Sequence, residues 1–236
     1  MRIMDVIYPS KCAFCGRIRR DEGPGACSTC AGRLPYVTEP VCVHCGKPVA
    51  SVRDVLCTDC RRRTHPMLTE ATALWVYRED TKRAMAGFKY GGFRGDAAYF
   101  ADELAARCHE KIFRWEPDVL VPIPIHRKRA RARGFNQAEL LADELGVRLQ
   151  FPVEGLLTRV RATTALKKLS PDERRKNLMK AFAVDKERFD PDRHRRVLLV
   201  DDIYTTGATM EACAGLLREA GAETVYGVCL CIGSEA

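Results

Sequence analysis

The chain has 236 residues, enough for one ordinary domain and a smaller accessory one. Its composition, 46% hydrophobic and 30% charged, is that of a globular protein. Because no apolar run approaches the roughly 20 residues that cross a bilayer, we expect no membrane insertion. The first residues lack the apolar core of a secretion signal, which favours a cytoplasmic protein.

Cysteines dominate the first quarter of the chain. Four Cys-x-x-Cys pairs begin 15 residues apart, and the first and third pairs are followed by glycine. A tetrahedral zinc site needs four thiolates on short turns that a hairpin brings together, and this spacing provides such a unit twice. We therefore predict two structural zinc ions. The predicted ligands are Cys12, Cys15, Cys27, Cys30, Cys42, Cys45, Cys57 and Cys60.

The duplicated unit favours one site from the first four ligands and one from the last four, while a crossed grouping stays open. Disulfides would require an oxidising compartment, and iron–sulfur clusters usually have less regular spacings. With eight cysteines available, we interpret His44 and His65 as bystanders. Eight thiolates on two zinc ions add −4 to the formal charge of +8, which leaves about +4 and weakens a charge-based argument for nucleic acid.

The dipeptide His65-Pro66 predicts a boundary between a small zinc domain at residues 1–66 and a larger domain at residues 67–236. The first part has few large aliphatic side chains, so metal binding must supply much of its folding free energy. The remaining cysteines lie in apolar patterns and are expected to be small buried hydrophobes. They are Cys108, Cys213, Cys229 and Cys231.

The larger part alternates strands with helices, which predicts a parallel α/β sheet flanked by helices. The first predicted elements are a strand at 70–78, a helix at 80–88 broken at 89–92, a helix at 96–113, and a strand from 118 that becomes a loop by Pro122. A helix at 136–145, a strand at 150–157, a polar connector at 159–180 and a strand at 182–184 that resumes the sheet follow. The last are a strand at 197–200, a helix at 210–220 ended by Gly221, and a strand at 224–231. The long connector is typical of a mobile lid.

Six of the eight residues at 126–133 are His, Lys or Arg. They follow the strand that begins at 118, and open α/β sheets bind ligands at the carboxyl ends of their strands. One interpretation is the solvated start of a basic helix. The other is an anion clamp, because Arg can hold phosphate oxygens bidentately.

The most informative stretch runs from Val197 to Thr209. Four apolar residues lead into Asp201 and Asp202, and a hydroxyl-rich turn with a glycine precedes the next helix. The carboxylates can accept hydrogen bonds from two ribose hydroxyls, and backbone N–H groups at the positive end of the helix can surround a phosphate. A capped strand–turn–helix is the plain alternative, but the joint pattern indicates a site for a phosphorylated sugar. The turn consists of Thr205, Thr206, Gly207, Ala208 and Thr209.

This stretch resembles the signature of type I phosphoribosyltransferases, which bind 5-phosphoribosyl-1-pyrophosphate (PRPP). Together with the segment from Pro122 to Ala138 and the cysteine-rich front, it makes the whole chain resemble the ComF (ComFC) family of competence-associated, phosphoribosyltransferase-like proteins. Many members of that family carry a double zinc ribbon. The resemblance extends to Lys89-Tyr90 and to the segment at 174–182.

The resemblance implies a type I phosphoribosyltransferase-like fold, PRPP bound with magnesium, and a role in DNA uptake or in the use of DNA-derived nutrients. In that mechanism Asp201 and Asp202 are the catalytic residues that orient the ribose, and the turn at 205–209 holds the 5′-phosphate. Arg127 and Arg133 neutralise the departing pyrophosphate. Because fold does not identify an acceptor, an active metabolic phosphoribosyltransferase with a structural zinc module is the alternative.

Nucleic-acid binding is a separate hypothesis. PRPP needs only a few cations, so the remaining ones of the basic segment look surplus and suit the phosphate backbone of single-stranded DNA. They are Lys128, Arg129 and Arg131. We expect Arg193, Arg195 and Arg196 near the rim of the same cleft, and a protein partner at the zinc ribbons.

Two features of the acceptor pocket stay open. Four aromatic side chains either line it or pack in the core: Trp75, Tyr77, Phe88 and Tyr90. In the connector, Leu166 stands where relatives often carry a glutamine, so a lid contact with substrate would be lost here.

Overall fold

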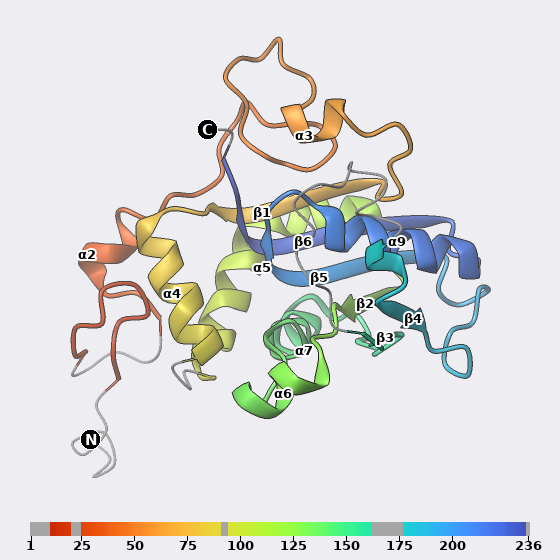
Figure 1. Cartoon of the computed structure of the whole chain (residues 1–236). Coiled ribbons are helices and arrows are strands. Elements are labelled where there is room, and N and C mark those ends of the chain that lie inside the picture. Colours follow the sequence, from red (N-terminus) through yellow and green to blue (C-terminus); the bar gives the residue numbers. More distant parts are fainter. Residues whose placement is uncertain (1–9, 20–24, 91–93, 162–176, 235–236) are drawn as a thin grey trace.

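A four-stranded parallel sheet forms the centre of the molecule (Figure 1). The structure, a computed structural model, describes residues 10–19, 25–90, 94–161 and 177–234. The strands lie in the order β1-β6-β5-β2, and each neighbouring pair is parallel. Their bounds are Glu70–Val76 for β1, Val119–Pro122 for β2, Arg196–Tyr204 for β5 and Thr224–Ile232 for β6. The expectation of a parallel α/β sheet is confirmed.

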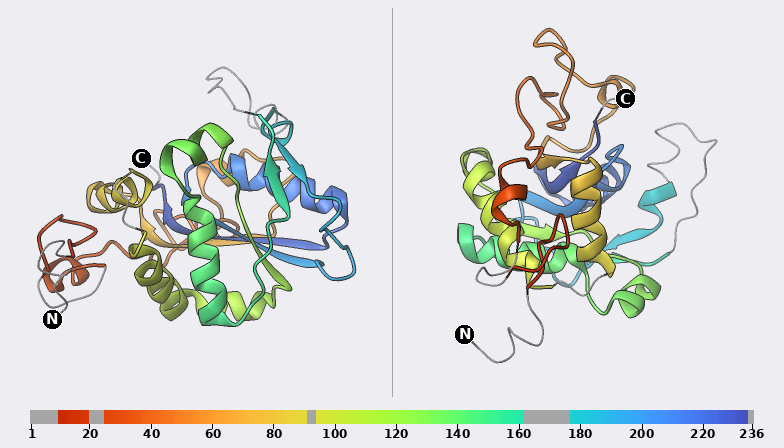
Figure 2. Two further views of the ribbon diagram at one scale, coloured as in Figure 1. Left: turned by 90° about the horizontal axis from the view of Figure 1, so that it is seen from below. Right: turned by 90° about the vertical axis from the view of Figure 1, so that its left-hand side faces the viewer.

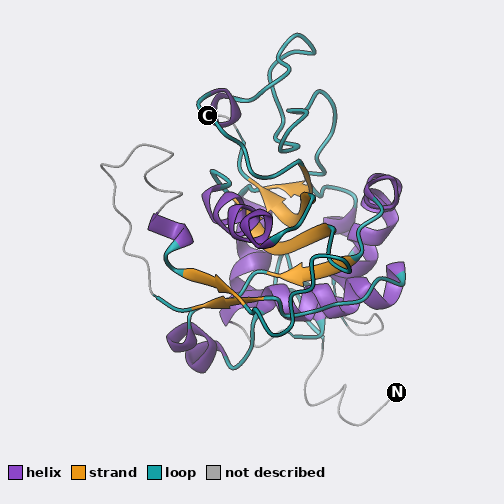
Figure 3. Cartoon of the chain, turned by 90° about the vertical axis from the view of Figure 1, so that its right-hand side faces the viewer, coloured by secondary structure: helices purple, strands orange, loops and turns teal. Residues whose placement is uncertain are grey.

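The sheet is covered on both faces, because the apolar side chains of its strands point alternately to either side. In β5, Leu198 and Val200 belong to one core, and Val197 and Leu199 belong to the other. Three helices contribute to the first core: α4 (Glu79–Tyr90), α5 (Asp96–Trp115) and α7 (Gln137–Leu149). The second core is covered by α9 (Ala208–Ala220). Figure 3 shows the strands between these helices.

The prediction that residues 182–184 resume the main sheet is wrong. They form β4 (Phe182–Val184), which pairs antiparallel with β3 (Leu157–Arg159) in a separate two-stranded sheet. Of the strand predicted at 150–157, only an isolated parallel bridge between Val153 and Leu120 lies along β2. Pro152 offers a carbonyl but no N–H to that edge, so the ladder does not continue.

Two other boundaries differ from the prediction. Helix α4 continues through Lys89 and Tyr90, which the sequence analysis took as a break. The basic segment forms a short helix, α6 (Arg127–Arg133). The side chain of His126 caps it by accepting a hydrogen bond from the Lys128 N–H at 3.2 Å, and Gly134 ends it at φ 78°.

The eight predicted ligands form two clusters, and the grouping in chain order is confirmed. In each cluster the four sulfur atoms lie within 4.8 Å of one another. Tetrahedral zinc with Zn–S bonds of 2.3 Å would separate its sulfurs by about 3.8 Å. The sulfurs of Cys15 and Cys27 are 3.9 Å apart, and those of Cys45 and Cys57 are 3.6 Å apart, so both clusters fit the ion.

Both clusters are built in the same way. A tight turn carries the first pair, and the glycine after it, Gly16 or Gly46, has a φ of 74°. A single helical turn carries the second pair: α2 (Ser28–Ala31) in the first ribbon and α3 (Thr58–Arg61) in the second. We use "first ribbon" for residues 10–34 and "second ribbon" for residues 41–63. Neither His44 nor His65 belongs to a cluster, as expected.

The two ribbons pack on opposite faces of the sheet. Phe14 of the first ribbon lies in the core with α4 and α5, 5.4 Å from the ring of Trp75. The second ribbon contributes its four cysteines to the core with α9. Figures 1 and 2 show the first ribbon beside α4 and the second beyond β1. The ribbons therefore straddle the β1 edge, and the division at residue 66 stays a prediction.

The other four cysteines are buried, as predicted. Within the ranges given above, no helix combines the length and the apolar character that crossing a bilayer requires.

Protein purified without added metal should contain close to two zinc ions per chain. Cys15→Ser should lose about one of them, because three thiolates hold the ion less tightly. It should also lower the free energy of unfolding, by up to the roughly 3–5 kcal/mol that removal of a buried Phe costs, since Phe14 would leave the core. Metal analysis and urea titration followed by tryptophan fluorescence measure the two effects. Metal-free protein with four disulfides would contradict the prediction.

Candidate functional site

The candidate site lies at the carboxyl ends of β2 and β5. The last paired residues of these strands are Pro122 and Val200, and β5 continues past this point into Asp201 and Asp202. The chain then leaves β5 for α9 on one face, whereas it leaves β2 for α6 and α7 on the other. Neighbouring strands whose connections diverge to opposite faces leave a crevice between them, and open α/β sheets bind ligands there.

The acidic pair is half-buried and carries an internal hydrogen bond. The Asp202 N–H donates to Oδ1 of Asp201 at 2.8 Å. Burial, followed by the charge of Asp202, raises the pKa of Asp201 to about 7. Asp201 is therefore only partly ionised near neutral pH.

A lysine that the sequence analysis did not assign to the site contacts this pair. Nζ of Lys89 lies 2.7 Å from Oδ2 of Asp202, and the two side chains are only 19% and 13% exposed. The last turn of α4 holds Lys89 in place. The extension of the family resemblance to Lys89-Tyr90 was the available signal for this role, but the pattern at 89–92 predicted a helix break there.

The turn at 205–209 joins β5 to α9, as predicted. Gly207 begins the helix in the left-handed region at φ 74°. A side chain there would also clash, because a Cβ atom would lie 2.0 Å from the hydroxyl of Tyr204. Thr205 and Thr206 are exposed in front of the N-terminus of a 13-residue helix, where backbone N–H groups and the helix dipole favour anions.

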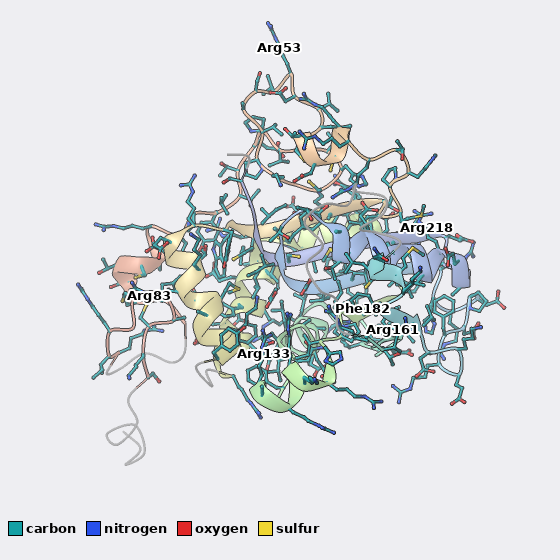
Figure 4. The ribbon with its side chains drawn as sticks, in the orientation of Figure 1. Arg53, Arg83, Arg133, Arg161, Phe182 and Arg218 are labelled. Carbon is teal, nitrogen blue, oxygen red and sulfur yellow. The ribbon has the colours of Figure 1, made fainter. Side chains whose placement is uncertain are left out.

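Arg133 faces the same end of α4. It donates to the hydroxyl of Tyr90 at 2.9 Å and to Oε1 of Gln137 at 2.8 Å, and its guanidinium lies over the Tyr90 ring. Figure 4 labels Arg133 close to this end of α4. Tyr90 is itself 73% exposed and adjoins Lys89 in sequence. Arg133 and Lys89 thus put two cations at one end of α4.

The other cations of α6 are exposed to solvent: Arg127, Lys128, Arg129 and Arg131. A further arginine approaches the site from β3. Arg159 stacks 5.0 Å over the Phe182 ring, and burial together with the charge of Arg129 lowers its pKa, while Asp201 acts in the opposite direction. In the sequence, Arg159 is the first residue of the polar connector at 159–180, and nothing in that pattern indicates this position.

The sequence left undecided whether four aromatic side chains line the acceptor pocket or pack in the core. Two of them, Trp75 and Phe88, are fully buried and therefore belong to the core. Tyr77 is partly buried against the same core. Only Tyr90 is largely exposed, and it is the one that contacts Arg133. The aromatic residue available to a bound ligand is therefore Tyr90.

The expectation that three arginines line the rim is wrong. Arg196 begins β5, at the opposite end of the strand from Asp201, and pairs with Glu116 and Asp118. Arg193 pairs with Glu154 and Arg195 with Glu223. Acidic partners at the amino end of the sheet hold these side chains away from the site. The proposed lid contact at Leu166 lies outside the described residues.

Comparison with known proteins gives matches along most of the chain. A double zinc ribbon domain matches residues 3–61, and a phosphoribosyl transferase domain matches residues 98–235. Competence protein F of Haemophilus influenzae is 31% identical over 91% of this chain and 93% of its own length. Competence protein ComFC of Bacillus subtilis is 32% identical, over 83% and 78%. DNA utilization protein YhgH of Escherichia coli O157:H7 is 30% identical, over 88% and 90%.

Each of these relatives matches more than four fifths of this chain. Two four-thiol clusters precede a parallel sheet whose central strand ends in the acidic pair, and both parts match their family models. The chain therefore belongs to the ComF family of competence-associated, phosphoribosyltransferase-like proteins with a double zinc ribbon.

Proposed function

We propose that the crevice binds PRPP together with magnesium. One observation carries this proposal. Asp201, Asp202 and the turn with Gly207 follow one another at the carboxyl end of β5, beside the end of β2, where the connections from the two strands lead to opposite faces of the sheet. Carboxylates that accept from ribose hydroxyls, beside N–H groups at a helix N-terminus, match a sugar with a 5′-phosphate. The phosphoribosyl transferase domain match over residues 98–235 supports the same ligand.

Each side chain then has a role. Asp201 and Asp202 orient the ribose and stabilise positive charge that develops at C1′. Backbone N–H groups at 205–209 hold the 5′-phosphate, with hydroxyls from Thr205, Thr206 and Thr209. Arg133 and Arg127 neutralise the pyrophosphate. Magnesium, when bound, screens the charge of the pyrophosphate and assists its departure.

For the biological role, we propose DNA uptake or the use of DNA-derived nutrients, in line with the names of the relatives. Eight thiols gathered in two zinc-type clusters suit a reducing compartment, so we place the protein in the cytoplasm. Single-stranded DNA is the proposed nucleic-acid partner. It would lie along the exposed cations of α6: Lys128, Arg129 and Arg131. A protein partner would contact the ribbons.

The alternative is an active metabolic phosphoribosyltransferase with a nucleobase or amine acceptor. Tyr90 favours it, because an exposed ring beside Lys89 and Arg133 could stack on an acceptor base. A screen of nucleobases, amines and oligonucleotides for PRPP-dependent release of pyrophosphate would identify such an acceptor.

Removal of both charges from the acidic pair should weaken Mg·PRPP binding by at least about 100-fold, because each charge-assisted hydrogen bond is worth roughly 1.5–3 kcal/mol. The variant is Asp201→Asn with Asp202→Asn, and calorimetry measures the dissociation constant. Circular dichroism should show an intact fold. Equal affinity in wild type and variant would refute the assignment of the sugar site.

Binding of Mg·PRPP should also weaken as the pH falls from 8 to 6. Because its pKa is raised to about 7, Asp201 takes up a proton in this interval and loses the charge that accepts from ribose. The expected change is up to about tenfold. Protonation of the PRPP phosphates is common to all variants, so a calorimetric titration of Asp201→Asn isolates the effect. The same pH dependence in that variant would contradict the prediction.

Replacement of Lys128, Arg129 and Arg131 by Gln should weaken binding to single-stranded DNA. It should flatten the salt dependence by roughly 0.7 per lost phosphate contact, while PRPP affinity changes little. Fluorescence anisotropy with a labelled oligonucleotide measures both DNA parameters. A matched variant removes three cations near the amino end of β5: Lys186, Arg188 and Arg193, each to Gln. If wild type does not bind DNA even at low salt, the result favours the metabolic phosphoribosyltransferase over a role in DNA uptake.

A further inference from the structure

One side chain of the second ribbon reaches into the turn at 205–209. Arg63 follows the last ligand of the second cluster by three residues, and its side chain is only 10% exposed. Its Nη1 atom donates to the sulfur of Cys60 at 3.3 Å and to the hydroxyl of Tyr204 at 3.2 Å. Its Nη2 atom donates to the carbonyl of Thr206. One guanidinium thus connects a cluster sulfur with the turn.

The contact with Thr206 fixes the direction of a peptide bond. In a planar trans peptide the C=O and the following N–H point in opposite directions. With its carbonyl held by Arg63, Thr206 directs the N–H of Gly207 away from the ribbon. Gly207 lies at φ 74°, where a glycine lets the preceding peptide turn over readily. Arg63 therefore selects one of two orientations for an N–H in the turn.

The guanidinium is itself held in place by Glu211. This carboxylate lies in the first turn of α9, is 2% exposed, and is 3.3 Å from Arg63. It also accepts from the N–H of Met67 at 2.7 Å and pairs with Nε2 of His44 at 3.2 Å. Buried charges that are fully hydrogen-bonded have a single favoured geometry, so Arg63 has little freedom to leave.

We propose that Arg63 is a positioning residue for the 5′-phosphate of the ligand, and that the second cluster sets the affinity of the turn through it. This inference rests on the proposed function, because it concerns the phosphate end of the same ligand. The first cluster lies on the other face of the sheet and has no such contact among the described residues.

The test compares three ligands: Mg·PRPP, ribose 5-phosphate and Mg·pyrophosphate. Arg63→Met should weaken PRPP and ribose 5-phosphate by about 10- to 100-fold, the equivalent of one charge-assisted hydrogen bond. Affinity for Mg·pyrophosphate, which lacks the 5′-phosphate, should stay within about twofold. Arg62→Met, which removes an exposed neighbouring cation, should leave all three unchanged. Calorimetry on the full chain measures each dissociation constant.

A second pair of variants tests the link to the cluster. Cys45→Ser and Cys15→Ser each disrupt one four-thiol site. Only Cys45→Ser should weaken ribose 5-phosphate binding selectively, because only the second cluster contacts Arg63. Equal effects of both cysteine variants on ribose 5-phosphate binding would show that the second cluster does not set the affinity of the turn.

The outcomes separate the two levels of inference. If wild type binds neither PRPP nor ribose 5-phosphate, the proposed function fails. If wild type binds both and Arg63→Met binds them equally well, the role of Arg63 fails alone. If Arg63→Met weakens all three ligands to the same extent, Arg63 supports the fold in general and does not position the phosphate.

Discussion

Four sulfurs held within 4.8 Å of one another are the constraint on which both ribbons depend. Among the described residues, the ribbons have only isolated bridges, such as Lys11 with Ile18 and Val41 with Pro48, and two single-turn helices. Such short elements cannot bury enough apolar surface to fold alone, so the metal must supply the missing free energy. The contacts that the ribbons make with the sheet, from Phe14 on one face and Arg63 on the other, follow from this coordination.

The two ribbons share a ligand spacing and a turn geometry but make chemically different contacts. The first offers an aromatic ring to the core of α4 and α5, a contact whose energy comes from burial. The second offers His44 and Arg63 to a buried carboxylate, Glu211, next to the candidate phosphate turn. Burial tolerates small displacements, whereas charged hydrogen bonds need a fixed geometry. The duplicated unit therefore makes an apolar packing contact on one face of the sheet and a charged, hydrogen-bonded contact on the other.

The grouping of the eight cysteines and the turn after β5 could be predicted because each depends on residues close together in the chain, and the alternation of strands with helices indicated a parallel sheet without its strand order. Apart from the end of α4, the errors concern contacts between segments that are separated in the chain. β4 pairs antiparallel with β3 instead of joining the main sheet, which no periodicity in residues 182–184 reveals. Lys89 and Asp202 meet only in the folded chain, and Arg63 lies 141 residues from Tyr204. A spacing rule cannot find such contacts.

The charges of the candidate site are arranged to receive an anion. Two adjacent carboxylates would repel a phosphorylated ligand if both were ionised and unpaired. Instead, Lys89 neutralises Asp202 at 2.7 Å, and Asp201 has its pKa raised to about 7. The cations of α6, which follows β2, and the N-terminus of α9, which follows β5, add positive charge near the carboxyl ends of these strands. In the proposed function, positive charge at this end of the sheet would draw the phosphate groups of PRPP to the crevice, and the carboxylates would accept hydrogen bonds from its ribose hydroxyls.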